Sequence, residues 1–147
     1  MSHTKITGML NALQEGVIDE LNFSEGDLNA RIDCGYLAGM LSGNFRYFYC
    51  VFKGVEDYYF QPWDDEEISC REVEDIRLFK PSIISIEMIA DDYLKIYSNC
   101  ENVYTGGNFY IKASDIRVFD EELNELSLEN LSELSDKYWY SENNAEG

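Results

Sequence analysis

The stretch ISIEMIADDYLKI, residues 84–96, decides the fold class. Apolar and polar residues alternate over 84–88, two aspartates follow at 91–92, and the alternation resumes over 94–96. Alternation with a period of two is typical of a strand with one buried face, and aspartates favour a turn. The stretch therefore predicts an antiparallel β-hairpin.

Similar patterns fill the chain from Leu28 to Phe119, which is rich in Tyr, Phe, Ile and Val. A second hairpin is expected around a turn at Thr105–Asn108, with its return strand over Phe109–Ala113, because glycines at 106 and 107 can take positive φ. An earlier pair, Phe45–Phe52 and Val55–Trp63, is expected to fold around Lys53-Gly54. The only two prolines, Pro62 and Pro81, are each expected to end a strand.

Two helices are expected at the ends of the chain. The first spans residues 9–22, where apolar residues recur every three or four positions at Leu10, Leu13, Val17 and Leu21. The second begins at Ser127 as N-cap and carries an apolar stripe of Leu128, Leu131, Leu134 and Tyr138. The predicted fold is α+β, with a mostly antiparallel sheet of about five to seven strands flanked by these helices. We expect one domain over 1–147, with 140–147 as a frayed acidic tail.

A short echo links two parts of the chain. Asp75–Phe79 reads DIRLF and Asp115–Phe119 reads DIRVF, about 40 residues apart. The echo is compatible with two related β-units, but five residues are also what two unrelated half-buried strands would share. Two similar strand ends are the preferred interpretation.

The chain has 147 residues and a net charge of -18, from 29 acidic and 11 basic residues. The acidic excess disfavours direct binding to nucleic acid or anionic lipid, because both need Lys and Arg, and it favours a basic partner. A content of 45% hydrophobic residues supplies enough apolar surface for a core. No apolar run of about 18 residues and no signal-peptide pattern occurs, so we expect no membrane span and a cytoplasmic location.

The charge is concentrated in two segments. Residues 54–75 hold nine acidic residues against Arg71 alone, and residues 120–147 hold nine against Lys137 alone. Residues 76–119 between them carry five acidic and five basic residues and are neutral. The charge is therefore placed in two blocks around a balanced sheet.

Each block suggests a candidate partner-binding site. In the first, aromatic residues precede a run of carboxylates, the composition of an interface with a basic protein, and only one of Tyr58 and Tyr59 should face outward. In the second, acidic residues recur every three or four positions along one face of the expected helix; the alternative for both is a solvated acidic surface. The candidate residues are Tyr58, Tyr59, Trp63, Asp64, Asp65, Glu66 and Glu67 in the first block, and Glu125, Glu129, Glu133 and Asp136 in the second.

No catalytic or cofactor motif is present. The only histidine is His3, no phosphate-binding glycine motif or EF-hand order occurs, and no cysteine pair has zinc-site spacing. We expect no cofactor and no metal, and we expect Cys34, Cys50, Cys70 and Cys100 to be buried free thiols, with two disulfides as the alternative. An enzyme is disfavoured because no specified site emerges.

These observations predict a non-enzymatic acidic protein that neutralises a basic partner. The favoured form is an immunity-type inhibitor of a bacterial nuclease-like toxin, whose cationic substrate cleft an acidic partner can block. The alternative is a nucleic-acid mimic that occupies a DNA-binding protein, of the anti-restriction or anti-CRISPR type. An enzyme or small-ligand-binding domain is the third class and would need a sizeable apolar pocket.

Overall fold

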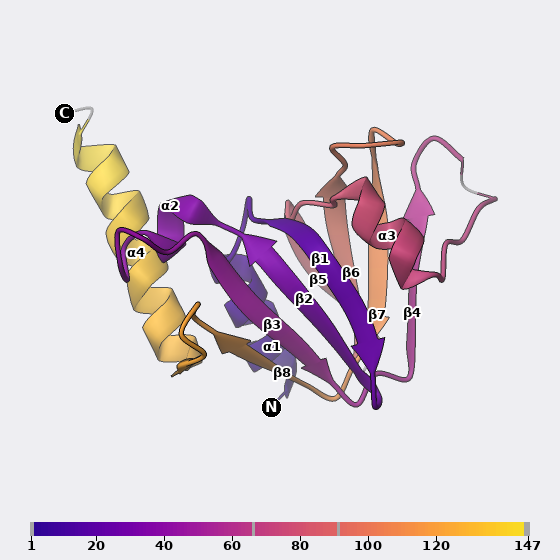
Figure 1. Ribbon diagram of the computed structural model, residues 1–147, viewed down its shortest axis with the longest axis horizontal. Coiled ribbons are helices and arrows are strands. Elements are labelled where there is room, and N and C mark those ends of the chain that lie inside the picture. Colours follow the sequence, from indigo (N-terminus) through magenta and orange to yellow (C-terminus); the bar gives the residue numbers. More distant parts are fainter. Residues whose placement is uncertain (1, 66, 91, 146–147) are drawn as a thin grey trace.

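The computed structural model describes residues 2–65, 67–90 and 92–145, and Figure 1 shows how their helices and strands are arranged. The α+β class predicted from the sequence is confirmed, with helices near both ends of the chain and strands that divide between two antiparallel sheets. The four helices are α1 (Ser2–Ala12), α2 (Gly35–Ala38), α3 (Val73–Phe79) and α4 (Leu128–Ala145). The strands are β1 (Val17–Ser24), β2 (Asp27–Asp33), β3 (Tyr47–Lys53), β4 (Asp57–Pro62), β5 (Ser85–Ala90), β6 (Tyr93–Asn99), β7 (Gly106–Lys112), β8 (Asp115–Phe119) and β9 (Glu125–Leu126).

The five-stranded sheet has the order β1-β2-β3-β8-β9. Alternate residues along its strands, such as Ala30, Cys50 and Val118, are buried on one face, and α1 lies behind that face in Figure 1. The four-stranded sheet has the order β4-β7-β6-β5 and buries Phe60, Phe109 and their neighbours. The inner faces of both sheets and the helices share one cluster of buried side chains. Each sheet therefore has a second face that is left for solvent or a partner.

The hairpin predicted from residues 84–96 is confirmed. β5 pairs with β6 in an antiparallel register that places Ile86 opposite Ile96 and Met88 opposite Leu94. Asp92 in the connection has a φ of 62°, a conformation that Asp tolerates better than most residues. The pattern in the sequence was sufficient here because both strands are local and half-buried.

The helix expected over residues 9–22 is wrong. The helix α1 ends at Ala12, and Val17–Ser24 forms the edge strand β1. A bulge between Ile18 and Glu20 shifts the strand by one residue, so Ile18 and Leu21 both point into the core although they lie three positions apart. The bulge therefore imitates the apolar spacing of a helix.

The expected pairing of 45–52 with 55–63 is also wrong. Both segments are strands, but β3 lies between β2 and β8 in one sheet, whereas β4 pairs with β7 in the other. Gly54, at a φ of 60°, turns the chain from one sheet to the other. Strand β4 ends at Pro62, as predicted.

The turn expected at Thr105–Asn108 lies earlier in the chain. Gly106 and Gly107 are the first two residues of β7, and the connection from β6 spans residues 100–105. A Cβ at Gly107 would lie 2.5 Å from the Phe60 ring, so this glycine makes room for a neighbouring aromatic side chain. The glycines serve close packing within the sheet and not a turn.

The echoed pentapeptides adopt different structures. Asp75–Phe79 belongs to α3, where Ile76 and Phe79 are buried three positions apart, whereas Asp115–Phe119 forms β8, where Ile116 and Val118 are buried two apart. Lys80, at a φ of 49°, ends α3, so Pro81 follows a helix and not a strand. The expectation that both segments are strands is wrong, and the structure gives no support to two related β-units.

The C-terminal helix begins where the sequence predicts. Ser127 Oγ accepts a hydrogen bond from the Asn130 amide at 3.0 Å, and Asn130 Oδ1 accepts one from the Ser127 amide. The four residues of the predicted apolar stripe pack on the core, with Leu131 fully buried. The helix continues to Ala145, so the backbone of residues 140–145 is helical; 146–147 lie outside the described residues.

The four cysteines are free, as the sequence predicts: Cys34 and Cys50 are buried, and Cys70 and Cys100 are half-buried. Burial raises the pKa of the Cys34 and Cys100 thiols to about 11, so both are protonated at neutral pH. In the described part of the chain, no helix combines the length and the apolar character that crossing a membrane requires.

Candidate functional site

The first candidate site is the loop that follows β4, where Trp63 is held in one position. Its Nε1 donates a hydrogen bond to Asn108 Oδ1 at 3.1 Å, and its ring lies against Gly106, where a Cβ would be only 2.5 Å from Cζ3. The indole is nevertheless 43% exposed. An ordered, exposed Trp offers apolar contact area to a partner at little entropic cost.

Tyr58 and Tyr59 lie on opposite faces of β4, as strand alternation predicts. Tyr58 packs on the core beside Phe23, with ring centroids 5.4 Å apart. Tyr59 lies on the outer face and stacks on Tyr110 at 4.6 Å, and the Arg71 guanidinium lies 5.0 Å from its ring. Of the two, only Tyr59 shares the outer face with Asn108, the partner of Trp63.

The carboxylates after Trp63 have different roles. Asp64 accepts hydrogen bonds from the Thr105 amide at 3.2 Å and hydroxyl at 3.0 Å, so it ties the loop to the residue that precedes β7. Asp65 accepts a bond from the Glu67 amide at 3.2 Å. Both Asp65 and Glu67 are exposed, and neither has an ion-pair partner in the described part of the chain. Glu66 lies outside the described residues.

Asp57 anchors the base of this loop region. Its carboxylate accepts hydrogen bonds from Arg71 at 2.6 Å and from the Tyr93 hydroxyl at 2.7 Å. Burial alone would raise the pKa of Asp57, but the bonds from Tyr93 and Arg71 outweigh it and lower the pKa below its usual value. Arg71, the only cation of the first acidic segment, is therefore already neutralised.

The second candidate site is only partly as predicted. Glu129, Glu133 and Asp136 are exposed on α4, but Glu125 lies in β9, before the helix begins. Glu125 forms a two-point ion pair with Arg117, with a shortest distance of 2.7 Å, and this hydrogen bond lowers its pKa. The expectation that all four acids form one helical row is wrong, because the β8–β9 pairing holds Glu125 on the sheet.

The two acidic segments lie at opposite ends of the molecule. In Figure 1, α4 is at the far left, whereas β4, its following loop and α3 are at the right. The structure thus gathers Tyr59, Trp63, Asp65 and Glu67 in one region and the α4 acids in another. The two candidate sites do not join into a single acidic face.

Most basic residues are paired with carboxylates, so the acidic excess is left exposed. Eight of the eleven Lys and Arg residues form ion pairs among the described residues: Lys5, Arg31, Arg46, Lys53, Arg71, Arg77, Lys112 and Arg117. The unpaired acids then set the field around the protein. Among the described residues, no three His, Cys, Asp or Glu side chains gather as metal ligands would.

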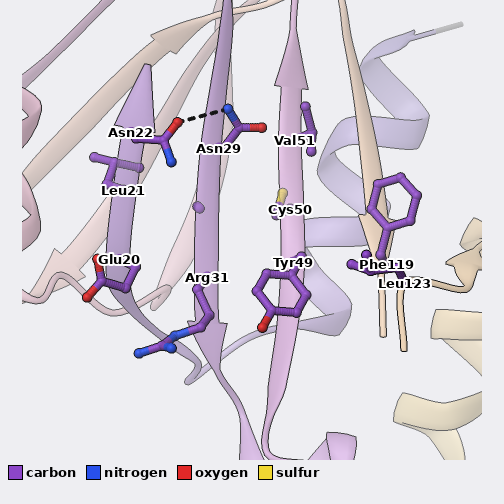
Figure 2. A pocket seen from close by; sticks show the side chains of 11 residues that line it. Glu20, Leu21, Asn22, Asn29, Arg31, Tyr49, Cys50, Val51, Phe119 and Leu123 are labelled. Carbon is purple, nitrogen blue, oxygen red and sulfur yellow. Dashed lines mark hydrogen bonds between the residues drawn. The ribbon is translucent and has the colours of Figure 1, made fainter. Parts of the chain in front are cut away.

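A groove on the outer face of the five-stranded sheet was not predicted from the sequence (Figure 2). It has a volume of about 430 Å³ and crosses β1, β2, β3 and β8. Its side chains come from four separate stretches of sequence, and each stretch reads as an ordinary half-buried strand. Strand alternation marks Tyr49, Val51 and Phe119 as outward-facing and could have suggested an aromatic surface. It could not have suggested which strands lie next to one another and so bring these residues together.

Comparisons with protein-family models, with curated proteins and with solved structures find no match to this chain.

Proposed function

We propose that this protein is a non-enzymatic, acidic binding protein that neutralises a basic partner protein. The observation that carries the proposal is Trp63, an exposed indole fixed by Asn108 and Gly106 beside the unpaired carboxylates of Asp65 and Glu67. An aromatic anchor supplies contact area, and adjacent carboxylates select Arg or Lys. Tyr59 and the Asp57–Arg71 pair support this loop from the sheet.

The favoured form is an immunity-type inhibitor of a bacterial nuclease-like toxin, acting in the cytoplasm. A nuclease needs a cationic cleft for its substrate, and a protein with a net charge of -18 is steered toward such a cleft at long range. The unpaired carboxylates of both acidic segments supply that field. Binding then blocks the cleft without any chemistry by the inhibitor.

The alternative is a nucleic-acid mimic that occupies a DNA-binding protein. Mimicry favours a continuous, elongated row of carboxylates in place of phosphates. The separation of the two acidic segments to opposite ends of the molecule, together with the compact patch around Trp63, favours the inhibitor (Figure 1). An enzyme or small-ligand-binding protein is a third class, and the open groove on the five-stranded sheet is the observation that favours it.

The proposal is tested by affinity capture from the native cells at about 50 mM salt, followed by identification of basic proteins and kinetics with the purified partner. The variant D65K/E67K reverses charges beside Trp63, and E129K/E133K makes the same charge change on α4. We expect D65K/E67K to slow association at least about tenfold and E129K/E133K to have a smaller effect. If both variants slowed association equally, the Trp63 loop would not be the interface. Failure to retain any basic protein would refute the proposed function.

A further inference from the structure

The groove on the five-stranded sheet is a trench between two rows of outward-facing side chains. One row is Asn22, Asn29 and Val51, and the other is Glu20, Arg31, Tyr49 and Phe119, each residue opposite the next in the strand register. Two residues along a strand are about 7 Å apart, which sets the width of the trench. Leu123 adds to the far wall beside Phe119 (Figure 2).

The surface of the groove is mostly apolar, and both of its charged side chains are in ion pairs. Arg31 forms a two-point ion pair with Asp19 at 2.9 and 3.1 Å, and Glu20 is paired with Arg77 at 3.4 Å. Asn29 donates to Asn22 Oδ1 at 3.1 Å, which leaves the Asn29 carbonyl oxygen and the Asn22 amide protons for another peptide group. An uncharged segment therefore fits the groove better than a charged one.

Leu123 is exposed and has an unfavourable backbone conformation. It has a φ of 65°, an unusual conformation for a leucine, and its side chain is 67% exposed. The buried Asp120 carboxylate fixes the loop by accepting hydrogen bonds from the amides of Glu122 and Asn124, each at 2.9 Å. The loop thus holds an apolar side chain outward at the wall of the groove.

The two acidic segments flank the groove at its two ends. At the β1 end lies α3, whose Arg77 pairs with Glu74 at 3.1 Å and with Glu20 at 3.4 Å, so two carboxylates share one cation there. At the β8 end lies the loop 120–124, where Glu122 is exposed beside Leu123. The sheet face thus has a neutral, apolar centre and negative charge on both sides.

We propose that this groove is the docking site for an extended, apolar segment of the basic partner, flanked on both sides by Lys or Arg. The four strands span about 14 Å, the length of about four extended residues, so an apolar centre of three or four residues would place its flanking cations beside the acids. This inference rests on the proposed function and adds the surface and the pattern of the partner segment. It is independent of the Trp63 loop.

The test titrates synthetic peptides into the ¹⁵N-labelled full chain and measures the changes in its amide NMR chemical shifts. The probe is Lys-Lys-Val-Trp-Val-Lys-Lys, with Glu-Glu-Val-Trp-Val-Glu-Glu and Lys-Lys-Ser-Gly-Ser-Lys-Lys as controls, titrated up to about 5 mM. We expect the probe alone to shift amides of β1, β2 and β3 around the groove. The variant L123N should raise its Kd about tenfold, because Asn tolerates positive φ but removes the apolar contact. The control I89S changes a leucine-sized exposed residue on the other sheet and should leave the Kd unchanged.

Every other result of the titrations would contradict one part of the proposal. Shifts confined to the Trp63 loop would overturn the groove and leave the proposed function intact. Equal binding of the glutamate peptide would overturn the charge pattern, and equal binding of the Ser-Gly-Ser peptide would overturn the apolar centre. An unchanged Kd for L123N would overturn the role of the groove wall, and no binding of any cationic peptide at low salt would count against both proposals.

Discussion

At the residue scale, the close approach of Trp63 to Gly106 connects the sheet to the candidate interface. The same glycine that lets the indole lie against β7 also accepts a backbone hydrogen bond from Trp63 at 3.0 Å. An added Cβ would meet the ring at 2.5 Å and the Ser98 carbonyl oxygen at 2.6 Å, so neither the side chain nor the backbone can yield easily. Position and exposure of the indole thus depend on a residue that has no side chain.

We therefore predict that Gly106→Ala destabilises the protein by about 1–3 kcal/mol, the usual cost of overpacking, and alters the Trp fluorescence spectrum. Urea unfolding measures the free energy, and the emission maximum, recorded in a Trp139→Phe background because the chain has two tryptophans, reports on the Trp63 indole. Gly43→Ala is the control, since a Cβ at Gly43 meets nothing within 4 Å. Similar stability of both variants would contradict the packing argument.

Asp57 gives a second prediction at this scale, on pH. Because its folded pKa is lowered, its stabilising effect is complete above the unfolded pKa of about 4 and is lost as the pH falls through the folded value. Asp57→Asn should cost about 1–2 kcal/mol at pH 7, and the difference from wild type should shrink toward pH 2. Asp136→Asn, an exposed carboxylate without an ion pair among the described residues, is the control and should show no such trend in urea unfolding. A difference independent of pH would rule out the ionised carboxylate as its source.

At the element scale, the same local pattern gives different structures in different surroundings. The pentapeptides at 75–79 and 115–119 differ by one residue, yet one is helical and the other extended. In 115–119 the neighbouring strand β3 supplies hydrogen bonds to every second residue, whereas 75–79 is packed as a short helix against β1 and the Phe60 ring. Tertiary packing overrides local propensity in segments as short as these. Long and local patterns, such as the 84–96 hairpin and the capped C-terminal helix, were predictable because their partners are adjacent in the chain.

The cap of α4 gives a prediction at this scale. Ser127→Ala should lower the free energy of unfolding by about 1 kcal/mol, since the Asn130 amide loses its acceptor. Ser132→Ala, in the interior of the same helix, is the matched control and should be neutral or slightly stabilising, because Ala favours a helix interior. Thermal or urea unfolding of both variants measures the difference, and an equal effect would show that the hydroxyl of Ser127 contributes nothing as a cap.

At the scale of the whole molecule, the excess charge acts on both stability and binding. Ion pairs use most of the cations, so the remaining carboxylates repel one another across the surface. Their position at the two ends of the molecule and beside the groove leaves the sheet face neutral. A basic partner would gain from the field of the whole protein and from the apolar surface at its centre.

This charge distribution predicts that added salt stabilises the protein. Between about 20 and 300 mM NaCl, screening weakens the repulsion among many unpaired acids more than the attraction in fewer, close ion pairs, so the melting temperature should rise by a few degrees. Calorimetry at neutral pH measures the shift. The variant E129K/E133K makes the net charge less negative by four, so its melting temperature should rise less with salt. A melting temperature that falls with salt would mean that the ion pairs dominate.

The α+β class, the local hairpin, the cap of the last helix, the alternation that turns only one of Tyr58 and Tyr59 outward, and the amount and segmental placement of the charge could all be predicted from the sequence. These features depend on neighbours within a few residues, where periodicity and capping act. Folding was needed to show that Tyr59 is the outward tyrosine, that β3 and β4 belong to different sheets and that Glu125 pairs with Arg117. It was also needed to show that the acidic segments lie at opposite ends of the molecule and that the sheet face carries a groove. Each of these results depends on contacts between distant segments, and their free energy arises only when the strands are assembled.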